Sequence, residues 1–332
     1  MKLYIHKILY LGLIITMIFH LQSCKDKHEN RWDIAINSSK SKVKITDISE
    51  KYYDTTLSLE DFKKDFPWFQ GDEISDEDFV KRRTDSLEVA VYQEAIANIK
   101  VPKLEQELSD LFAHIKHYYP KFEQPKVYIF SSALQMVKQT PMIYNPQSNV
   151  LFIDISSFMG TKSKFYEGLE EYLKSSMNAE NIVVKVAEVI VSNVVPFDKN
   201  NQKFIDKLVY QGKKQILLDA FLPNISDELK MNLTKEKYAW SVSNEANIWN
   251  FFVENDLVFS ADPRLEDRFI TEAPFSKFYT EIDRKSSPRV GVFIGWQICK
   301  HFLAENPKVN LQDFLKMNAT IIFNQSKYNP KN

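Results

Sequence analysis

Glu188 is the acidic residue whose surroundings point most directly to a chemical role. It lies in the segment 182–197, IVVKVAEVIVSNVVPF, in which most of the other residues are Val, Ile or Ala. A carboxylate in such surroundings has three interpretations. It can lie on the polar edge of a core helix, it can act as a catalytic acid or base, or it can remain from a site that has lost its chemistry.

The order of segments around Glu188 is similar to that of zinc-dependent metallopeptidases. In their H-E-x-x-H signature the two His side chains share a helix face and bind zinc, while the Glu activates the bound water. On this template Ala187 and Val191 occupy the His positions, Gln211 on a later helix occupies the position of a third ligand, and 149–155 is the edge strand. Ala and Val cannot bind zinc, and Gln is a poor ligand. We therefore interpret Glu188 as a relic, expect neither a metal nor another cofactor, and treat Ala187, Val191 and Gln211 as degenerate metal positions.

The remaining histidines offer no obvious replacement for the missing ligands. His114 and His117 are three residues apart on one amphipathic pattern. That spacing can bind a metal with outside help, but it also suits a solvated helix edge near a helix C-terminus. His28 and His301 stand alone in the sequence.

The first 23 residues predict a lipoprotein signal peptide. Lys2 and Lys7 give a positive start, and the apolar run 8–21 is shorter than the about 20 residues of a membrane-spanning helix. The run ends in LQSC, which is typical of a lipobox with Cys24 as the lipid-bearing residue. The alternative is an ordinary secretory signal that contains a Cys. The lipobox predicts a chain anchored by acyl chains in a membrane of the cell envelope, facing the periplasm or the cell surface.

Composition narrows the function classes. The formal net charge is −1, and without Lys2 and Lys7 it is −1 − 2 = −3, so no basic excess favours nucleic acid. The chain has 7 Gly residues and contains no glycine-rich phosphate loop. With Cys24 lipidated, Cys299 has no partner for an internal disulfide, so the fold depends on its core. We expect Cys299 to be a buried small apolar residue.

The apolar patterns predict a mostly α (α+β) fold, a helical domain with one small β-sheet. Residues 24–56 read as a tether with short extended segments, and 57–332 as a single helix-rich domain. Two β-branched and aromatic runs, at 125–132 and 149–156, predict strands of one sheet. Helical patterns with caps or terminal prolines are predicted at 57–67, 75–99, 101–120, 163–176, 182–197, 202–223, 234–255, 288–307 and 311–323.

Three polar residues in the second half of the chain are candidates for a cleft or a partner contact. Asn244 and Glu245 lie between Trp240 and Trp249 on a helical pattern. They could line the cleft, or Glu245 could pair with a base such as Arg289 and fix the packing. Gly291 and Gly295, four residues apart, are expected to let one helix approach its neighbour closely.

Several segments of the second half form one recognisable set: 211–223, the residues Trp240, Asn244, Glu245, Ile248 and Trp249, and the C-terminal block Pro288, Arg289, Gly291, Gly295, Trp296 and Gln297. Together they resemble the gliding-motility lipoprotein GldB family. The resemblance covers nearly the whole mature chain, and the family is itself similar to a group of predicted zinc proteases in which the zinc ligands are intact. The family usually has a Gly between the Pro and the Arg of its C-terminal block, a residue that this chain lacks, which could alter the turn.

The resemblance implies a metallopeptidase (zincin)-like scaffold and a role in the gliding motility and type IX secretion machinery. Together with the degenerate metal positions, it favours a noncatalytic, membrane-anchored lipoprotein that binds envelope partners through the old cleft or a surface. Two alternatives remain open. One is an active cell-envelope hydrolase, such as a peptidase with a site that the sequence does not reveal, and the other is a solute-binding lipoprotein.

Overall fold

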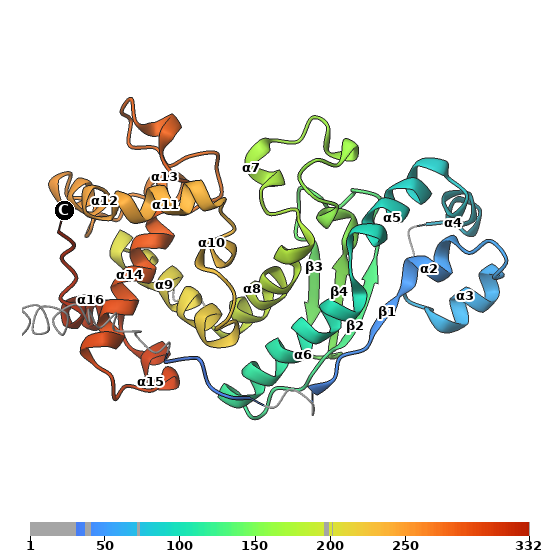
Figure 1. The fold of residues 1–332 in the computed structure, drawn as a ribbon, viewed down its shortest axis with the longest axis horizontal. Coiled ribbons are helices and arrows are strands. Elements are labelled where there is room, and N and C mark those ends of the chain that lie inside the picture. Colours follow the sequence, from blue (N-terminus) through green and yellow to red (C-terminus); the bar gives the residue numbers. More distant parts are fainter. Residues whose placement is uncertain (1–30, 37–40, 72–73, 196–198, 201, 332) are drawn as a thin grey trace, which may run out of the picture. The chain divides into compact units, whose positions relative to one another are not determined.

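The β-sheet brings together strands that are distant in sequence (Figure 1). In the part of the chain that the computed structural model describes, it has the strand order β1-β2-β4-β3. β1 (Ile45–Asp47), β2 (Lys126–Phe130) and β4 (Val150–Asp154) are parallel, whereas β3 (Met142–Asn145) is antiparallel to β4 and forms one edge. The model describes residues 31–36, 41–71, 74–195, 199–200 and 202–331.

The strands predicted at 125–132 and 149–156 are confirmed as β2 and β4, but the prediction of the edge strand was wrong. β4 lies between β2 and β3, so the segment 149–155 is not at an edge. The edge strand is β3, which follows Pro141 and has only four residues. So short a strand gives almost no period-two pattern, which is why the sequence did not reveal it.

The mostly helical character expected from the sequence is confirmed. Helices follow the sheet strands and fill most of residues 155–331. The fifteen α-helices of the described ranges are α2 (Ile48–Tyr53), α3 (Leu59–Asp65), α4 (Asp76–Arg83), α5 (Ser86–Asn98), α6 (Val101–Tyr118), α7 (Glu171–Lys174), α8 (Ile182–Val194), α9 (Phe204–Phe221), α10 (Asp227–Lys230), α11 (Lys235–Ser243), α12 (Glu245–Glu254), α13 (Arg264–Phe269), α14 (Val290–Glu305), α15 (Leu311–Lys316) and α16 (Ala319–Ser326).

Residues 45–47, inside the segment 24–56 where we expected short extended segments, form a strand, and residues 48–53 form a helix. β1 and α2 lie in this segment, and Ile48 and Tyr52 of α2 are buried with Phe62, Phe66 and Phe79 in one aromatic cluster. Residues 35–332 group into one unit, apart from residues 1–34. The signal segment and Cys24 lie outside the described residues, so the lipobox stays a prediction.

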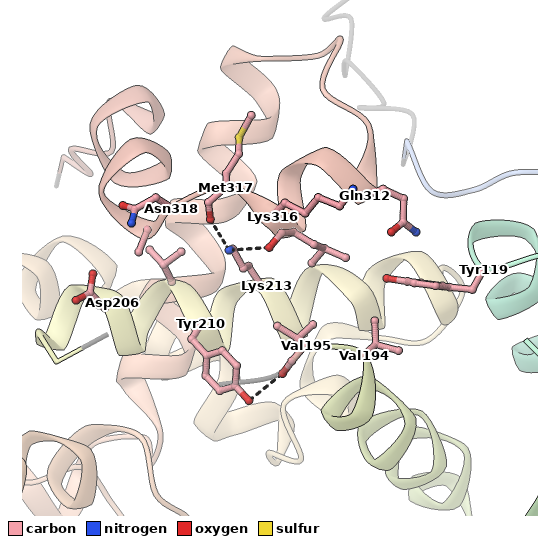
Figure 2. A pocket seen from close by; sticks show the side chains of 13 residues that line it. Tyr119, Val194, Val195, Asp206, Tyr210, Lys213, Gln312, Lys316, Met317 and Asn318 are labelled. Atoms are coloured by element: carbon pink, nitrogen blue, oxygen red, sulfur yellow. Dashed lines mark hydrogen bonds between the residues drawn. The ribbon is translucent and has the colours of Figure 1, made fainter. Parts of the chain in front are cut away.

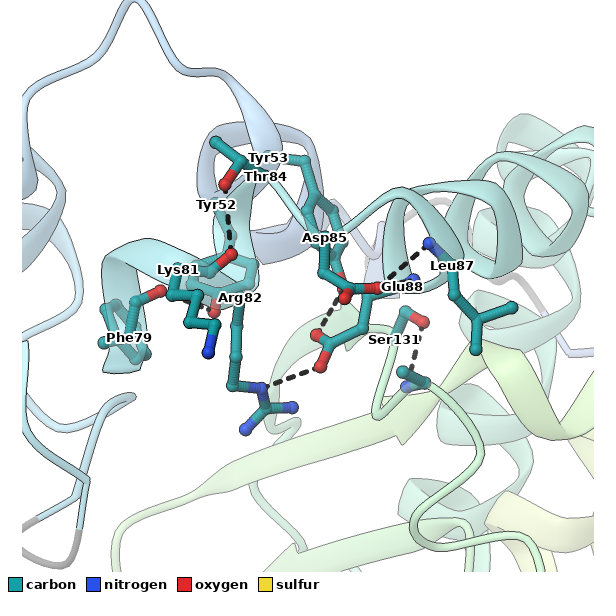
Figure 3. A network of polar contacts seen from close by, with 11 residues as sticks. Tyr52, Tyr53, Phe79, Lys81, Arg82, Thr84, Asp85, Leu87, Glu88 and Ser131 are labelled. Carbon is teal, nitrogen blue, oxygen red and sulfur yellow. Dashed lines mark hydrogen bonds and ion pairs between the residues drawn. The ribbon is translucent and has the colours of Figure 1, made fainter. Parts of the chain in front are cut away.

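The aromatic cluster covers one face of the sheet. Side chains alternate between the two faces along a strand, and Tyr128 and Phe152 point to the cluster while Ile129 and Ile153 are fully buried. Polar contacts fix the turn from α4 into α5, as Figure 3 shows. There Arg82 Nε lies 2.9 Å from Glu88 Oε1, and Asp85 caps α5 by accepting from the backbone of Leu87 and Glu88.

The crossing of α9 and α14 depends on glycine. A Cβ on Gly212 would overlap the carbonyl oxygen of Gly295, and a Cβ on Gly295 would overlap the carbonyl oxygen of Leu208. Gly291 is similarly close to the backbone of Phe269. The expectation for Gly291 and Gly295 is therefore confirmed, and Cys299 is buried at the same crossing, 2.6 Å from where that Gly212 Cβ would lie.

The patterns at 75–99, 163–176 and 311–323 are each divided into two shorter helical segments, unlike the single helices that we expected. The pattern at 234–255 likewise forms two helices. The break is at Asn244, whose Nδ2 and backbone N–H both donate to the carbonyl oxygen of Trp240. Asn competes for backbone hydrogen bonds in this way, which favours helix ends. Within the described ranges no helix combines the length and apolar character needed to cross a membrane.

Candidate functional site

A cavity of about 370 Å³ lies between α8, α9 and the start of β3, and we call it the α8–α9 cleft. Helix α8 contacts both α9 and β3, so these three elements set the positions of its walls. Glu272 and Arg289, from the segments that flank α13 and α14, complete the lining. The cleft is lined by Gln139, Thr140, Pro141, Met142, Lys185, Glu188, Val189, Val191, Ser192, Gln211, Lys214, Gln215, Leu218, Glu272 and Arg289.

Helix α8 is amphipathic in a way that explains the position of Glu188. The residues Ile182, Val183, Val184, Val186, Ala187, Ile190 and Val191 are buried. Lys185, Glu188, Val189 and Ser192 follow the i, i+3, i+4, i+7 spacing of one helix face, and all four line the cleft. Glu188 thus lies on the polar edge of a core helix, and that edge is the wall of a cavity.

The Glu188 carboxylate is held on both sides. Its Oε1 accepts a hydrogen bond of 2.7 Å from Asn232 Nδ2, and its Oε2 lies 3.3 Å from Lys185 Nζ. Lys185 also lies 3.6 Å from Glu272 Oε1. Burial alone would raise the pKa of Glu272, but the charges of Lys185 and Arg289 outweigh burial and lower it. Lys185 therefore bridges the two carboxylates of the cleft.

The degenerate metal positions do not all meet. Val191 and Gln211 line the cleft beside Glu188, whereas Ala187 is fully buried and is not among the lining residues. The residues present do not fit zinc, because two aliphatic side chains and one amide stand where imidazole and carboxylate would be needed. The described residues contain no cluster of three or more His, Cys, Asp or Glu side chains placed to hold a metal ion.

Two further cations face the cleft without a close carboxylate. Lys214 and Arg289 have no carboxylate oxygen within 4 Å among the described residues, although Arg289 donates through one Nη1 to the carbonyl oxygen of Met231 at 2.8 Å. Burial lowers the pKa of Lys214, and Arg289 lowers it further, while Glu188 opposes both. Arg289 has a left-handed backbone (φ 57°) immediately before α14, so the turn holds its side chain toward the cleft.

Gln215 adds an unpaired polar group to the same wall. Its side chain is buried, and its Oε1 has no hydrogen-bond partner among the described residues. The sequence analysis missed both Lys214 and Gln215. The signal was present in QGKKQILL, because residues 211, 214, 215 and 218 have helical spacing and share one face of α9.

Asn244 and Glu245 lie elsewhere. Neither lines the α8–α9 cleft, and the suggested pairing of Glu245 with Arg289 was wrong. Glu245 Oε1 instead accepts a hydrogen bond of 2.9 Å from the hydroxyl of Tyr328 near the C-terminus. The alternative that Arg289 contributes to the cleft fits its place in the lining.

The His114 side chain contacts the backbone of its own helix. Its Nδ1 lies 2.8 Å from the carbonyl oxygen of Asp110, one turn earlier on α6. The ring of His117 packs edge-on against Tyr118. These contacts fit the structural interpretation of the two histidines.

A second cavity, of about 460 Å³, lies between α9 and the C-terminal helices (Figure 2). Its central cation is Lys213, whose Nζ donates to the carbonyl oxygens of Leu315 and Met317 at 2.9 and 2.6 Å. Because this ammonium already has backbone acceptors, it ties α9 to the segment between α15 and α16. The charged groups of the α8–α9 cleft are better placed for a ligand.

Comparison with known proteins gives one finding. The family model described as gliding motility protein GldB matches residues 29–330, which is nearly all of the chain. No curated protein and no solved structure matches the chain. The chain therefore belongs to the family of the gliding motility protein GldB, whose members are gliding motility lipoproteins associated with the cell envelope.

Proposed function

We propose that this protein is a noncatalytic lipoprotein, anchored through acylated Cys24, that binds a protein partner of the gliding and type IX secretion machinery in the α8–α9 cleft. One observation carries the proposal. Val191, Gln211 and Glu188 line one cleft, and the Glu188 carboxylate there is held by Lys185 and Asn232. The proposal keeps the scaffold and the cleft of a peptidase and assigns them to binding.

Charge supports binding over hydrolysis. The cleft contains three cations, Lys185, Lys214 and Arg289, against the two carboxylates Glu188 and Glu272. In a zinc peptidase the general base acts on a water that the metal holds, and the residues at the ligand positions here do not fit zinc. Each oxygen of Glu188 already has a partner within 3.3 Å, so the carboxylate is arranged as a structural ion-pair and hydrogen-bond centre.

The binding proposal is tested by blocking the cleft. Ser192 is exposed and lines the cleft, whereas the neighbouring Asn193 is exposed and is not in the lining. We expect Ser192→Trp to abolish gliding and to lose the envelope proteins that co-purify with the wild type, at an unchanged protein level. The matched control Asn193→Trp should glide normally. If Ser192→Trp glides normally and retains the same co-purified proteins, the cleft is not the binding site.

The noncatalytic part has a separate test. Glu188→Gln retains an oxygen that can accept from Asn232 but cannot act as a carboxylate base. We expect this variant to glide, and we expect purified full-length wild-type protein to contain no stoichiometric zinc. Loss of gliding in Glu188→Gln with the co-purified proteins still present, or one zinc per chain, would favour the hydrolase alternative.

A further inference from the structure

The ligand of the α8–α9 cleft can be narrowed from the groups that the fold leaves unpaired. Within the cleft Lys185 lies within 4 Å of both Glu188 and Glu272. Lys214 and Arg289 therefore remain as two neighbouring cations without a carboxylate at contact distance among the described residues. Two partly buried like charges repel, and an anion placed between them would relieve that repulsion.

Arg289 has unused donors for such an anion. One Nη1 donates to the carbonyl oxygen of Met231, and the described residues supply no other hydrogen-bond acceptor to the guanidinium. A guanidinium has five N–H donors in a planar fork that matches a carboxylate. With the ammonium of Lys214 in the same cavity, the pair presents both a planar donor and a point charge to one anionic group.

Gln215 indicates that the ligand also carries a donor. Its buried Oε1 has no partner among the described residues, and leaving a buried acceptor unpaired is unfavourable. An N–H group of a ligand would remove that cost. An anion with an adjacent N–H is the arrangement at the end of a peptide, where the terminal carboxylate follows the last amide.

The edge strand β3 supplies a place for the rest of such a chain. Asp154 N donates to the carbonyl oxygen of Pro141 at 2.8 Å, and bonded pairs alternate along an antiparallel ladder. Ile143 is thus bonded toward β4, while Met142 and Tyr144 direct their backbone groups to the open edge. The hydroxyl of Thr140 donates to the Met142 carbonyl at 3.2 Å and Met142 is buried, so the open groups of this edge are the backbone N–H and C=O of Tyr144, which have no partner among the described residues.

The direction of a bound strand follows from the lining. Thr140, Pro141 and Met142, at the start of β3, lie in the same cavity as Lys214 and Arg289. A peptide that pairs antiparallel to β3 has its C-terminal end at the start of β3. Its terminal carboxylate would then reach the two cations.

We propose that the α8–α9 cleft binds the C-terminal carboxylate of an extended peptide segment between Lys214 and Arg289, with the preceding residues paired to the edge of β3. This rests on the proposed function, because it names the chemistry of the partner that the cleft holds. Main-chain pairing at a sheet edge supplies affinity, and the carboxylate pocket specifies a chain end.

The test uses full-length protein in detergent and two pools of fluorescein-labelled random hexapeptides. One pool ends in a free α-carboxylate and the other in a carboxamide. We expect fluorescence anisotropy to show binding of the carboxylate pool and about tenfold weaker binding of the carboxamide pool, the loss typical of one charge-assisted hydrogen-bonding group. Equal binding of the two pools, or no binding of the carboxylate pool, would overturn the inference.

Variants assign the effect to the cations. Lys214→Gln and Arg289→Gln should each weaken the carboxylate pool to the level of the carboxamide pool and leave the carboxamide pool unchanged. The control Lys235→Gln removes the same charge at an exposed position outside the cleft and should bind as the wild type. Two folded cleft variants that bind the carboxylate pool at wild-type strength would contradict the assignment.

The outcomes separate this inference from the proposed function. If Ser192→Trp loses gliding and its co-purified proteins while the two peptide pools bind alike, the cleft binds a partner but does not recognise a chain end. If Ser192→Trp glides normally while the carboxylate pool binds selectively, the peptide site exists but does not serve the proposed role.

Discussion

Helix α9 has two faces that treat polar groups in opposite ways. On the face toward α14, Asp219 is buried, yet its Oδ1 lies 2.8 Å from Lys230 Nζ and its Oδ2 accepts from Trp296 Nε1 at 2.8 Å. On the face toward the cleft, Lys214 has no close carboxylate among the described residues, and Gln215 Oε1 has no partner.

The difference separates polar groups that hold the fold from polar groups that wait for a ligand. Buried polar atoms in native proteins nearly always have a hydrogen-bond partner. The Asp219 cluster obeys that rule within the chain, so it needs nothing from outside. On the cleft face Gln215 Oε1 departs from that rule among the described residues, and we assign its missing partner to a ligand.

Asp219→Ala should give the largest effect, because it breaks the satisfied cluster. The buried ammonium of Lys230 would lose its closest carboxylate and keep only Asp227 at 3.7 Å, and breaking a buried pair costs about 3 to 5 kcal/mol. Urea unfolding of the full-length protein in detergent should show this decrease in the free energy of unfolding. The control Asp267→Ala removes an exposed carboxylate and should change stability by less than about 0.5 kcal/mol. Equal effects of the two substitutions would mean that the buried cluster adds no stability.

Neighbouring residues of α9 give the next contrast. Gly212→Ala would place a methyl group against the carbonyl oxygen of Gly295, and overpacking of this kind costs about 1 to 3 kcal/mol. Gln211→Ala changes a cleft residue and should stay within about 0.5 kcal/mol. Urea unfolding of both variants checks the contrast. A Gly212→Ala variant as stable as the wild type would show that α9 and α14 can separate at little cost.

Lys214→Met should be neutral or slightly stabilising, in contrast to Lys230→Met, which removes the cation that pairs with Asp219. Burial disfavours the charged form of Lys214, which no close carboxylate compensates, so removal of the charge should alter the free energy of unfolding by at most about 1 kcal/mol. Lys230→Met should instead destabilise the protein strongly, because Asp219 would be left buried without its cation. A large loss of stability in Lys214→Met would place Lys214 among the structural cations.

The smallest effect is a pH dependence that isolates Lys214. Its pKa in the folded state is lowered from 10.5, first by burial, with Glu188 opposing and Arg289 adding to the shift. Between the folded and unfolded pKa values the unfolded chain binds more protons, so stability rises with pH in that window. The stability gap between Lys214→Met and the wild type should therefore shrink as pH rises toward 10.5. A gap that widens would require a raised pKa.

The sequence predicted the framework better than the site. Strong periodic patterns located most of the helices and the strands β2 and β4. The metallopeptidase template placed Glu188, Val191 and Gln211 near one another. The template also placed Ala187 at the cleft, but Ala187 is buried in the core. Helix periodicity tells which residues share a face but not which face points to the core. β3 escaped detection because four residues after a proline carry too little pattern.

Long-range partners were the least predictable. The charge types of Glu245 and Arg289 allowed a pair, but nothing in their spacing tells how far apart the fold holds them. Glu245 accepts a hydrogen bond from Tyr328, and Arg289 donates to the backbone carbonyl of Met231. The face of α9 formed by residues 211, 214, 215 and 218 could have been read from helical spacing, yet which cations lack a carboxylate depends on contacts between distant segments.

The glycine crossing has a consequence for how the cleft responds to a ligand. Because the backbones of α9 and α14 touch at Gly212 and Gly295, no side-chain rotation can loosen that contact. Lys214 follows Gly212 on α9, and Arg289 directly precedes α14. Both cations are therefore attached to the same rigid pair of helices, so the distance between their backbone positions is set before any ligand binds. Binding would then order few degrees of freedom in the protein, so most of the entropic cost of capture would fall on the flexible chain end.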